Sequence, residues 1–311
     1  QYSHLNQKYG GYYSQAQIKE VIAYAAQRGI EVIPEIDIPG HCRAAILSMP
    51  DLLAEPEDKS QYRSVQHYND NVLNPGLEGT YQFIDAVLKE VAELFPSQYV
   101  HMGADEVPEG VWEQSPAAQA FMQKHQLPNT KALQGHFLRY IENKLVDLGK
   151  RMMGWEEVYH GEKISTNTII CSWTSEEAGL KCASQGFDVI LQPAQYNYFD
   201  IIQSDHVDEL GANWAGVTPL QKTYSYEPLA SLDRQSATFK HVMGLQAGVW
   251  CELINSQQRL DFMLYPRLLA MAEVSWTDSE NRNWNDFICR LNLRKPSLDA
   301  QQIEYRPWDE K

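Results

Sequence analysis

The feature that most constrains this chain is a helix followed by a strand that ends in polar or aromatic residues, a unit that recurs along the sequence. In the first copy, apolar residues recur at helical spacing from Ile18 to Ala26, after Ser14 as the expected N-cap, and the strand 30–37 follows. Further strands are predicted at 97–100, 151–158, 168–173, 187–191 and 242–250. Because no hairpin signal separates them, a parallel sheet with crossover helices is expected.

Helical periodicity predicts the segments between and after these strands. Thr80 is expected to cap the second helix, which runs to Leu94, and Gly149 is expected to end a later one. From the second onward, the predicted helices cover 80–94, 116–126, 130–148, 176–185, 260–274 and 286–293. The chain is therefore expected to belong to the α/β class.

The residues that follow the strands distinguish between two α/β architectures. Polar or aromatic residues follow every strand, and no glycine-rich phosphate turn follows an early one. This distribution favours a (β/α)8 barrel of the TIM type over an open doubly wound sheet. Such a barrel needs about eight strands, so the first two are expected to be missing. Residues 1–311 are expected to form one barrel domain, with the third to eighth strands, the C-terminal helices and an upstream segment absent.

Composition excludes several classes of partner. The net charge of −15 and a pI near 5.0 argue against nucleic acid and anionic membrane surfaces, which require basic patches. The five cysteines are widely spaced and odd in number, without paired metal-ligand spacing, and are expected to be buried free thiols. The sequence shows no apolar run long enough to span a membrane and no signal peptide.

The adjacent acids Asp105 and Glu106 lie in the stretch 101–106, which follows the predicted strand 97–100. Neighbouring residues of a strand point to opposite faces, and an unpaired buried carboxylate is costly, so these side chains are expected to face a cleft. The alternative is a helix cap or a structural ion pair.

Carboxylates among aromatic residues suggest a sugar-binding site, with core packing as the alternative role for each Trp. The residues at strand ends that could bind a sugar are Trp155, Trp173, Tyr198, Asp200, Trp214, Trp250 and Glu252.

Two neighbouring carboxylates do not straddle a sugar as the usual glycosidase pair does. If Glu106 is the proton donor, Asp105 is better suited to orient the 2-acetamido group of a substrate that supplies its own nucleophile.

His41 and His101 could be metal ligands with Asp105 or Glu106, but their spacing in the sequence does not favour a metal site. Hydrogen bonding that links the carboxylates is the preferred role, with Asp37 and His41 positioning Glu106, and a buried structural histidine is the alternative.

Several stretches carry a family resemblance. They are GGYYSQ at 10–15, RGIEVIPEIDIPGH at 28–41, HMGADE at 101–106, GWEE at 154–157 and WCE at 250–252. In this order, over nearly the whole chain, they resemble the catalytic barrel of the β-N-acetylhexosaminidases of glycoside hydrolase family 20. Ala104 stands where many members have a second glycine, a change that should be tolerated.

The resemblance implies a role for each matching residue. Glu106 would act as general acid and then base, Asp105 would hold the acetamido group, and Tyr198 would donate to the acetamido oxygen. Asp200 and Glu252 would bind sugar hydroxyls, and His41 and His101 would support the site. The pocket walls would be Trp155, Trp173 and Trp250, with Trp214 on the aglycone side.

The implied activity is exo-acting, retaining hydrolysis of terminal β-linked GlcNAc or GalNAc from oligosaccharides, without cofactor or metal. A homodimer is left open, and a periplasmic or secreted location is implied by the bacterial members. The family's first strand brings an arginine and its second an acid; neither can be assigned here, so the chain alone is expected to have little activity. The alternatives are a two-carboxylate retaining glycosidase, a non-catalytic sugar-binding barrel and a metal-dependent hydrolase.

Overall fold

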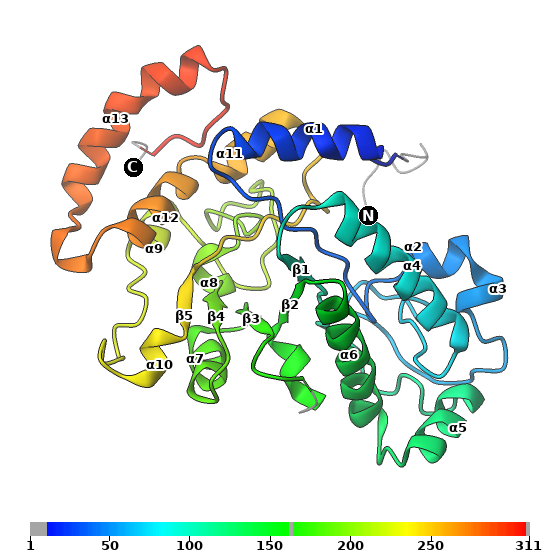
Figure 1. Cartoon of the computed structure of the whole chain (residues 1–311). Helices are drawn as coiled ribbons and strands as arrows, with labels where there is room; N and C mark the ends of the chain where they lie inside the picture. The colour runs from blue at the N-terminus through cyan, green and yellow to red at the C-terminus, as the bar shows by residue number, and fades with distance from the viewer. Residues whose placement is uncertain (1–10, 162–163, 309–311) are drawn as a thin grey trace. The chain divides into compact units, whose positions relative to one another are not determined.

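The computed structural model describes residues 11–161 and 164–308, so Gly10 of the first resemblance stretch lies outside the described residues. The chain divides into two compact units, Gln1–Thr168 and Ile169–Lys311, which we call the N-terminal and C-terminal units. Figure 1 colours the chain from one end to the other. The single domain expected for 1–311 stays a prediction.

The N-terminal unit contains a parallel strand pair and the helices that precede and follow it. Val100 of β1 pairs with Met152 of β2. The elements are α1 (Gln15–Ala26), α2 (Arg43–Ser48), α3 (Pro50–Leu53), α4 (Glu78–Leu94), β1 (Tyr99–His101), α5 (Pro116–His125), α6 (Thr130–Asp147), β2 (Arg151–Trp155) and the 3₁₀ helix η1 (Glu156–Gly161).

Two predicted N-caps in this unit differ in outcome. Ser14 is confirmed as the N-cap of α1, because its side chain accepts from Gln17 N–H and the Gln17 side chain accepts from Ser14 N–H. Thr80 was expected to cap α4, and this prediction is wrong: the helix begins at Glu78. The Thr80 hydroxyl instead donates to the carbonyl of Asn74 at 2.7 Å, which holds the first turn of α4 against the preceding loop.

The predicted strand 30–37 is present only as a single bridge. Glu35 pairs in parallel with His101, and His101 N–H donates to the Pro34 carbonyl at 2.9 Å. Pro34 has no N–H to donate and cannot extend the ladder. The segment nevertheless runs alongside β1, and this brings Asp37 beside the acidic motif.

The core of the N-terminal unit lies between its strands and the helices α4 and α6. Fully buried side chains come from β1, from α4 and from α6. They include Val100, Ile84, Leu88, Phe137, Leu138 and Ile141. The apolar stripes of both helices therefore hold β1 in place, and β1 in turn sets the position of the loop that follows it.

The C-terminal unit contains three parallel strands in the order β3, β4, β5. Ile170 pairs with Val189, and Leu191 pairs with Leu245. The elements are β3 (Ile169–Ser172), α7 (Glu176–Ser184), β4 (Val189–Leu191), α8 (Ala194–Asn197), α9 (Leu220–Tyr224), α10 (Ala237–Lys240), β5 (Val242–Leu245), α11 (Gln257–Leu264), α12 (Arg267–Trp276), the 3₁₀ helix η2 (Ser279–Asn281) and α13 (Trp284–Ala300).

Three predictions for the last part of the chain are wrong. The predicted strand 242–250 ends at Leu245, after which Gly248 only bridges Tyr198. The predicted helix 260–274 is two helices, α11 and α12, because Pro266 cannot continue the first. The predicted helix 286–293 is the middle of the longer α13, which continues past Pro296.

The helices predicted at 116–126, 130–148 and 176–185 are confirmed as α5, α6 and α7, each within a residue of its predicted end.

No disulfide links the cysteines in the described part of the chain, but Cys251 and Cys289 are exposed, so the prediction of burial was wrong for these two. Cys289 lies on the solvent side of α13, where periodicity alone did not reveal the exposed face. Among the described residues, no helix is long and apolar enough to cross a membrane.

Candidate active site

The acidic motif of the N-terminal unit follows β1 through a loop of left-handed backbone. Gly103, Ala104 and Glu106 have φ values of 61°, 82° and 51°. A Cβ at position 103 would lie 1.7 Å from the Asp37 carboxylate oxygen Oδ1, so only glycine permits this approach. Ala104 N–H then donates to the same oxygen at 3.2 Å. The loop thus ties Asp37 to the acid pair.

His41 connects the three carboxylates of this loop region. Its Nε2 lies 3.4 Å from Asp105 Oδ2, 3.4 Å from Glu106 Oε2 and 4.0 Å from Asp37 Oδ2. Its other ring nitrogen, Nδ1, contacts the side-chain amide of Gln66 at 3.0 Å. One imidazole therefore bridges the adjacent acids, as the sequence predicted for a histidine that links carboxylates.

The acids set the charge on His41. Hydrogen bonds to Asp105 and Glu106 raise its pKa to about 10, so the ring is cationic at neutral pH. Burial, together with the nearby Asp105 charge, raises the pKa of Asp37 to about 8. Asp37 therefore holds a proton at neutral pH, and the His41 imidazolium lies between Asp105 and Glu106.

His101 and Trp155 form a second contact group beside the loop. The Trp155 ring is 2% exposed, lies 4.6 Å from the His101 ring between centroids, and donates its indole N–H to Glu35 at 3.2 Å. His101 Nδ1 accepts from Gly103 N–H at 3.1 Å and lies 3.4 Å from the Glu35 carboxylate. The two residues are thus fixed at the ends of the paired strands β1 and β2, with little of the Trp155 ring accessible.

In the C-terminal unit, Tyr198 is the centre of an aromatic cluster. Its ring centroid lies 5.6 Å from that of Trp214, 6.2 Å from that of Trp250 and 6.4 Å from that of Trp173. Tyr198 itself is buried, whereas Trp214 is 56% exposed. The residues predicted as sugar-binding aromatics of this unit are therefore brought together, with Trp214 outermost.

Asp200 and Glu252 lie beside this cluster. Asp200 is buried, and its Oδ1 has no hydrogen-bond partner in the described residues of the chain. Burial raises the pKa of Asp200 to about 6, against hydrogen bonds from backbone N–H groups that lower it; the nearby charge of Glu252 raises it further. Asp200 thus remains mostly ionised at neutral pH and can accept from a hydroxyl group.

Comparison with known proteins identifies the family. Residues 1–279 match the model of the glycosyl hydrolase family 20 catalytic domain. A β-hexosaminidase of Vibrio furnissii is 59% identical over 272 residues, which cover 88% of this chain and 44% of that protein. The chain belongs to glycosyl hydrolase family 20.

Solved family 20 structures extend this match to the fold. The GH20 exo β-N-acetylglucosaminidase of Vibrio harveyi in complex with N-acetylglucosamine matches with a TM-score of 0.96 and 57% identity, over 99% of this chain and 48% of that chain. The β-N-acetylhexosaminidase of Streptomyces coelicolor matches with a TM-score of 0.78 and 28% identity, over 96% of this chain and 57% of that one. The predicted α/β barrel class is confirmed, and the chain spans about half the length of these relatives.

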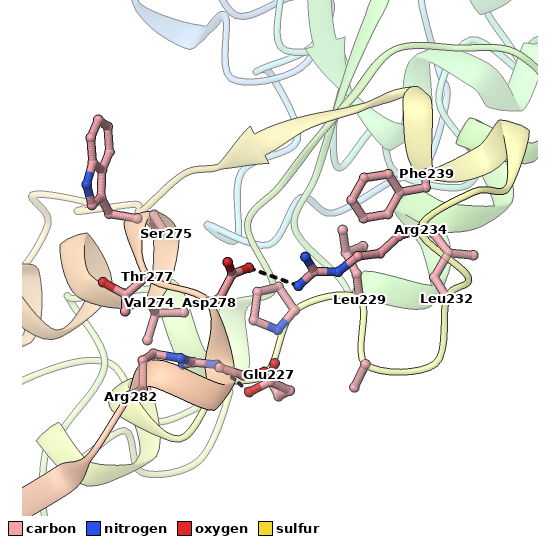
Figure 2. A pocket seen from close by; sticks show the side chains of 14 residues that line it. Glu227, Leu229, Leu232, Arg234, Phe239, Val274, Ser275, Thr277, Asp278 and Arg282 are labelled. Atoms are coloured by element: carbon pink, nitrogen blue, oxygen red, sulfur yellow. Dashed lines mark hydrogen bonds and ion pairs between the residues drawn. The ribbon is translucent and has the colours of Figure 1, made fainter.

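The pocket shown in Figure 2 is separate from the predicted family 20 site residues. It has a volume of about 390 Å³ and lies in the C-terminal unit between the 227–239 segment and the end of α12. Its charged lining residues form the pairs Arg234–Asp278 and Arg282–Glu227. None of the predicted site residues lines it, and its charges compensate one another.

A metal site is the remaining chemical alternative in the N-terminal unit. Ligand atoms of Asp37, His41 and Asp105 lie within 4.8 Å of one another. The alternative left open by the sequence combined His41 and His101 with Asp105 or Glu106. Nδ1 of His101 instead accepts from the backbone. The raised pKa of His41 opposes metal binding, since a ligating imidazole must be deprotonated.

The structure adds supporting residues that the sequence analysis missed. Glu35 contacts both Trp155 and His101, Gln66 contacts His41, and Gly103 admits Asp37. Glu35 could have been found, because it is two residues before Asp37 and so shares its face of the extended segment. Gln66 lies in a long irregular loop, and no local pattern indicates its contact.

Proposed function

We propose that this chain is the catalytic part of an exo-acting β-N-acetylhexosaminidase. It removes terminal β-linked GlcNAc or GalNAc from oligosaccharides, with retention and with the substrate's acetamido group as nucleophile. The observation that carries the proposal is the position of His41 Nε2, 3.4 Å from each of the adjacent acids Asp105 and Glu106. The names of the relatives, a β-hexosaminidase and an exo β-N-acetylglucosaminidase, support it.

In the first step, Glu106 donates a proton to the glycosidic oxygen while the acetamido carbonyl oxygen attacks the anomeric carbon. The bond to the leaving sugar breaks, and an oxazoline-type ring closes. Asp105 accepts from the acetamido N–H; its Oδ1 is buried and has no hydrogen-bond partner among residues 11–161 and 164–308. The carboxylate thereby stabilises the positive charge that develops on the acetamido nitrogen.

In the second step, Glu106 takes a proton from water, which attacks the anomeric carbon and opens the ring with overall retention. His41 keeps both carboxylates oriented through its two 3.4 Å contacts. In the C-terminal unit, Tyr198 donates to the acetamido oxygen, and Asp200 and Glu252 accept from sugar hydroxyls. The proposed sugar-contacting tryptophans are Trp155 of the N-terminal unit and Trp173 and Trp250 of the C-terminal unit, and Trp214 is proposed to contact the aglycone.

The test compares two aryl β-glycosides that differ only at C2, in the natural polypeptide that carries this chain. The N-acetylglucosaminide should be hydrolysed faster than the glucoside by orders of magnitude, because only the former supplies an intramolecular nucleophile. Comparable rates would instead support a two-carboxylate mechanism. Sugar binding without hydrolysis of either glycoside would support a non-catalytic barrel.

The cluster Asp37, His41 and Asp105 makes a metal-dependent hydrolase the second candidate. EDTA distinguishes the two mechanisms. Substrate-assisted hydrolysis should continue at an unchanged rate after chelation, whereas a hydrolase that depends on a metal-activated water should lose its activity.

A periplasmic or secreted location is inferred from the bacterial relatives alone, and cell fractionation tests it. Light scattering distinguishes the homodimer from a monomer.

A further inference from the structure

We propose that Arg267 is a positioning residue for sugar binding, which holds the segment 198–202 so that Tyr198 and Asp200 meet the substrate in a fixed geometry. The inference rests on the function proposed for Tyr198 and Asp200. It assigns a role to a residue that touches no substrate. All of the contacts that carry it lie within the C-terminal unit.

Arg267 is the first residue of α12, and its side chain is 0% exposed. Its Nη2 donates to the carbonyl of Phe199 at 2.6 Å, and its Nη1 donates to the carbonyl of Ile201 at 3.0 Å. These two carbonyls flank Asp200 in the chain. One guanidinium therefore donates hydrogen bonds to the backbone on both sides of Asp200, which carries the proposed sugar-binding carboxylate.

The same guanidinium also anchors the segment to its surroundings. Nη1 donates to the carbonyl of Thr218 at 3.0 Å, and Nη2 donates to that of Met263 at 2.8 Å. The planar fork of arginine can make such a set of contacts at once, which a lysine ammonium cannot reproduce in that geometry. Arg267 thus joins the segment 198–202 to the following loop and to α11.

Backbone hydrogen bonds of the segment 198–202 also fix the positions of its side chains. Phe199 N–H donates to the Gly248 carbonyl at 2.8 Å, and Ala212 N–H donates to the Asp200 carbonyl at 2.8 Å. Phe199 and Asp200 form a turn between the bridges that Tyr198 and Ile201 make with Gly248 and Ala212, so Tyr198 and Asp200 are the chain neighbours of Phe199 on its two sides. A shift of the Phe199 and Ile201 carbonyls would therefore move both proposed substrate contacts together.

Charge gives Arg267 a second influence on Asp200. The charged groups that face Asp200 are Glu252, which raises its pKa, and Arg267, which lowers it. Glu209 and Arg306 are the other charges that act on Arg267. Burial lowers the pKa of Arg267 to about 9, which leaves it cationic at neutral pH. Removing the guanidinium should raise the pKa of Asp200 above its value of about 6, so that its carboxylate loses charge at a higher pH.

The experiment measures GlcNAc binding by calorimetry against pH in the natural polypeptide that carries this chain. Arg267→Met should raise Kd roughly tenfold, and the loss of binding on acidification should begin at higher pH than in the wild type. Arg267→Lys, which keeps the charge, should restore the pH dependence but not the full affinity. With Asp200→Asn, the pH-dependent loss should be absent, whichever residue stands at 267.

Arg282→Met is the matched control. Arg282 is also an arginine of this unit, with a side chain that is 7% exposed, and it donates to the carbonyls of Tyr224 and Tyr226. Its loss should lower Tm without altering Kd or its pH dependence. A folded Arg267→Met protein with the wild-type Kd and pH dependence would overturn the inference. If Arg267→Met does not fold, Arg267→Lys decides: a raised Kd supports the positioning role, and a wild-type Kd overturns it.

Failure of the proposed function would look different. A wild-type protein that binds no GlcNAc would refute the proposed function and the inference with it. Wild-type binding that is unaffected by both Arg267 variants would overturn the inference alone.

Discussion

The two units of this chain differ in the kind of predicted site residue that each brings together. In the N-terminal unit the arrangement is ionic, with His41 Nε2 at 3.4 Å from both Asp105 and Glu106. In the C-terminal unit it is aromatic, with three tryptophan rings whose centroids lie within 6.4 Å of that of Tyr198. The charged groups are fixed by backbone and imidazole contacts, and the aromatic ones by mutual packing.

This difference separates two ways of contributing to a reaction. Charged groups act most strongly where charge develops in the transition state, so their loss should lower kcat. Stacking on a sugar is present before and during the reaction alike, so its loss should mainly raise KM. Substitutions in the two units should therefore have different kinetic signatures, and each prediction below tests that division.

The largest effect is expected for Glu106→Gln. A glutamine cannot donate a proton to the leaving oxygen, so kcat and kcat/KM should fall about 10²–10⁴-fold, with little change in KM. Steady-state kinetics with an N-acetylglucosaminide and an alkyl leaving group measure this. The loss in kcat/KM, which reports the first step, should be smaller with a nitrophenyl leaving group, which needs less protonation. Equal losses in kcat/KM on both substrates would remove the role of general acid from Glu106.

Asp105→Asn should have the next largest effect. The amide cannot balance the charge that develops on the acetamido nitrogen, so kcat should fall about 10²–10³-fold, as for other preorganised electrostatic contacts. Inhibitors that mimic the oxazoline should also bind more weakly, whereas GlcNAc affinity should change little. An Asp105→Asn protein with wild-type inhibitor affinity would contradict the role proposed for Asp105.

The sequence predicted the fold best where the pattern is local. The start of α1 follows from the capping side chain of Ser14, and the extent of α6 follows from its apolar stripe and from Gly149 after its end. These predicted ends are confirmed to within a residue. The strand 30–37 was overestimated, because β-prone residues alone do not ensure a second partner and Pro34 removes a donor. The unbroken helix 260–274 was wrong, because its apolar period continues through Pro266.

The site was predictable to the extent that strand ends could be recognised. Asp105, Glu106 and His41 come together as the barrel pattern implied, since parallel strands end at one edge. The contacts of Gln66 and Arg267 were beyond the sequence. Gln66 reaches His41 from an irregular loop, and Arg267 binds backbone carbonyls, which every residue has and no motif marks.

His41→Gln should alter stability in a pH-dependent way. Hydrogen bonds to Asp105 and Glu106 raise the pKa of His41 from 6.5 to about 10. A group whose pKa is higher in the folded state than in the unfolded state contributes its full stabilisation at pH values below the unfolded-state pKa. That contribution is lost as the pH rises through the folded-state pKa. Thermal melts should therefore show wild-type Tm above that of His41→Gln by roughly 5 °C near neutrality, with the gap closing towards pH 10.

Asp37 also titrates in this cluster, so the comparison uses the difference between variants at each pH. Burial raises its pKa from 3.8 to about 8, and stability from this group falls as pH rises through that window. The nearby His41 charge lowers this pKa, so the window should reach to higher pH in His41→Gln than in the wild type. His206→Gln, which removes an exposed imidazole from the C-terminal unit, is the control and should leave Tm unchanged. A constant gap between wild type and His41→Gln at all pH values would refute the ionic contacts assigned to His41.

The smallest effect is expected for Trp214→Ala, at the exposed edge of the aromatic cluster. Loss of one stacking surface costs about 0.5–1.5 kcal/mol, which corresponds to a rise in KM of roughly 2–10-fold. Because Trp214 is proposed to contact the aglycone, the rise should appear with chitin-type disaccharides and not with small alkyl glycosides, and kcat should not change. Trp276→Ala is the matched control, since this residue is 92% exposed but lines the separate pocket of Figure 2. If Trp214→Ala lowered kcat as Asp105→Asn is expected to, the division between an ionic unit that acts on the transition state and an aromatic unit that binds would fail.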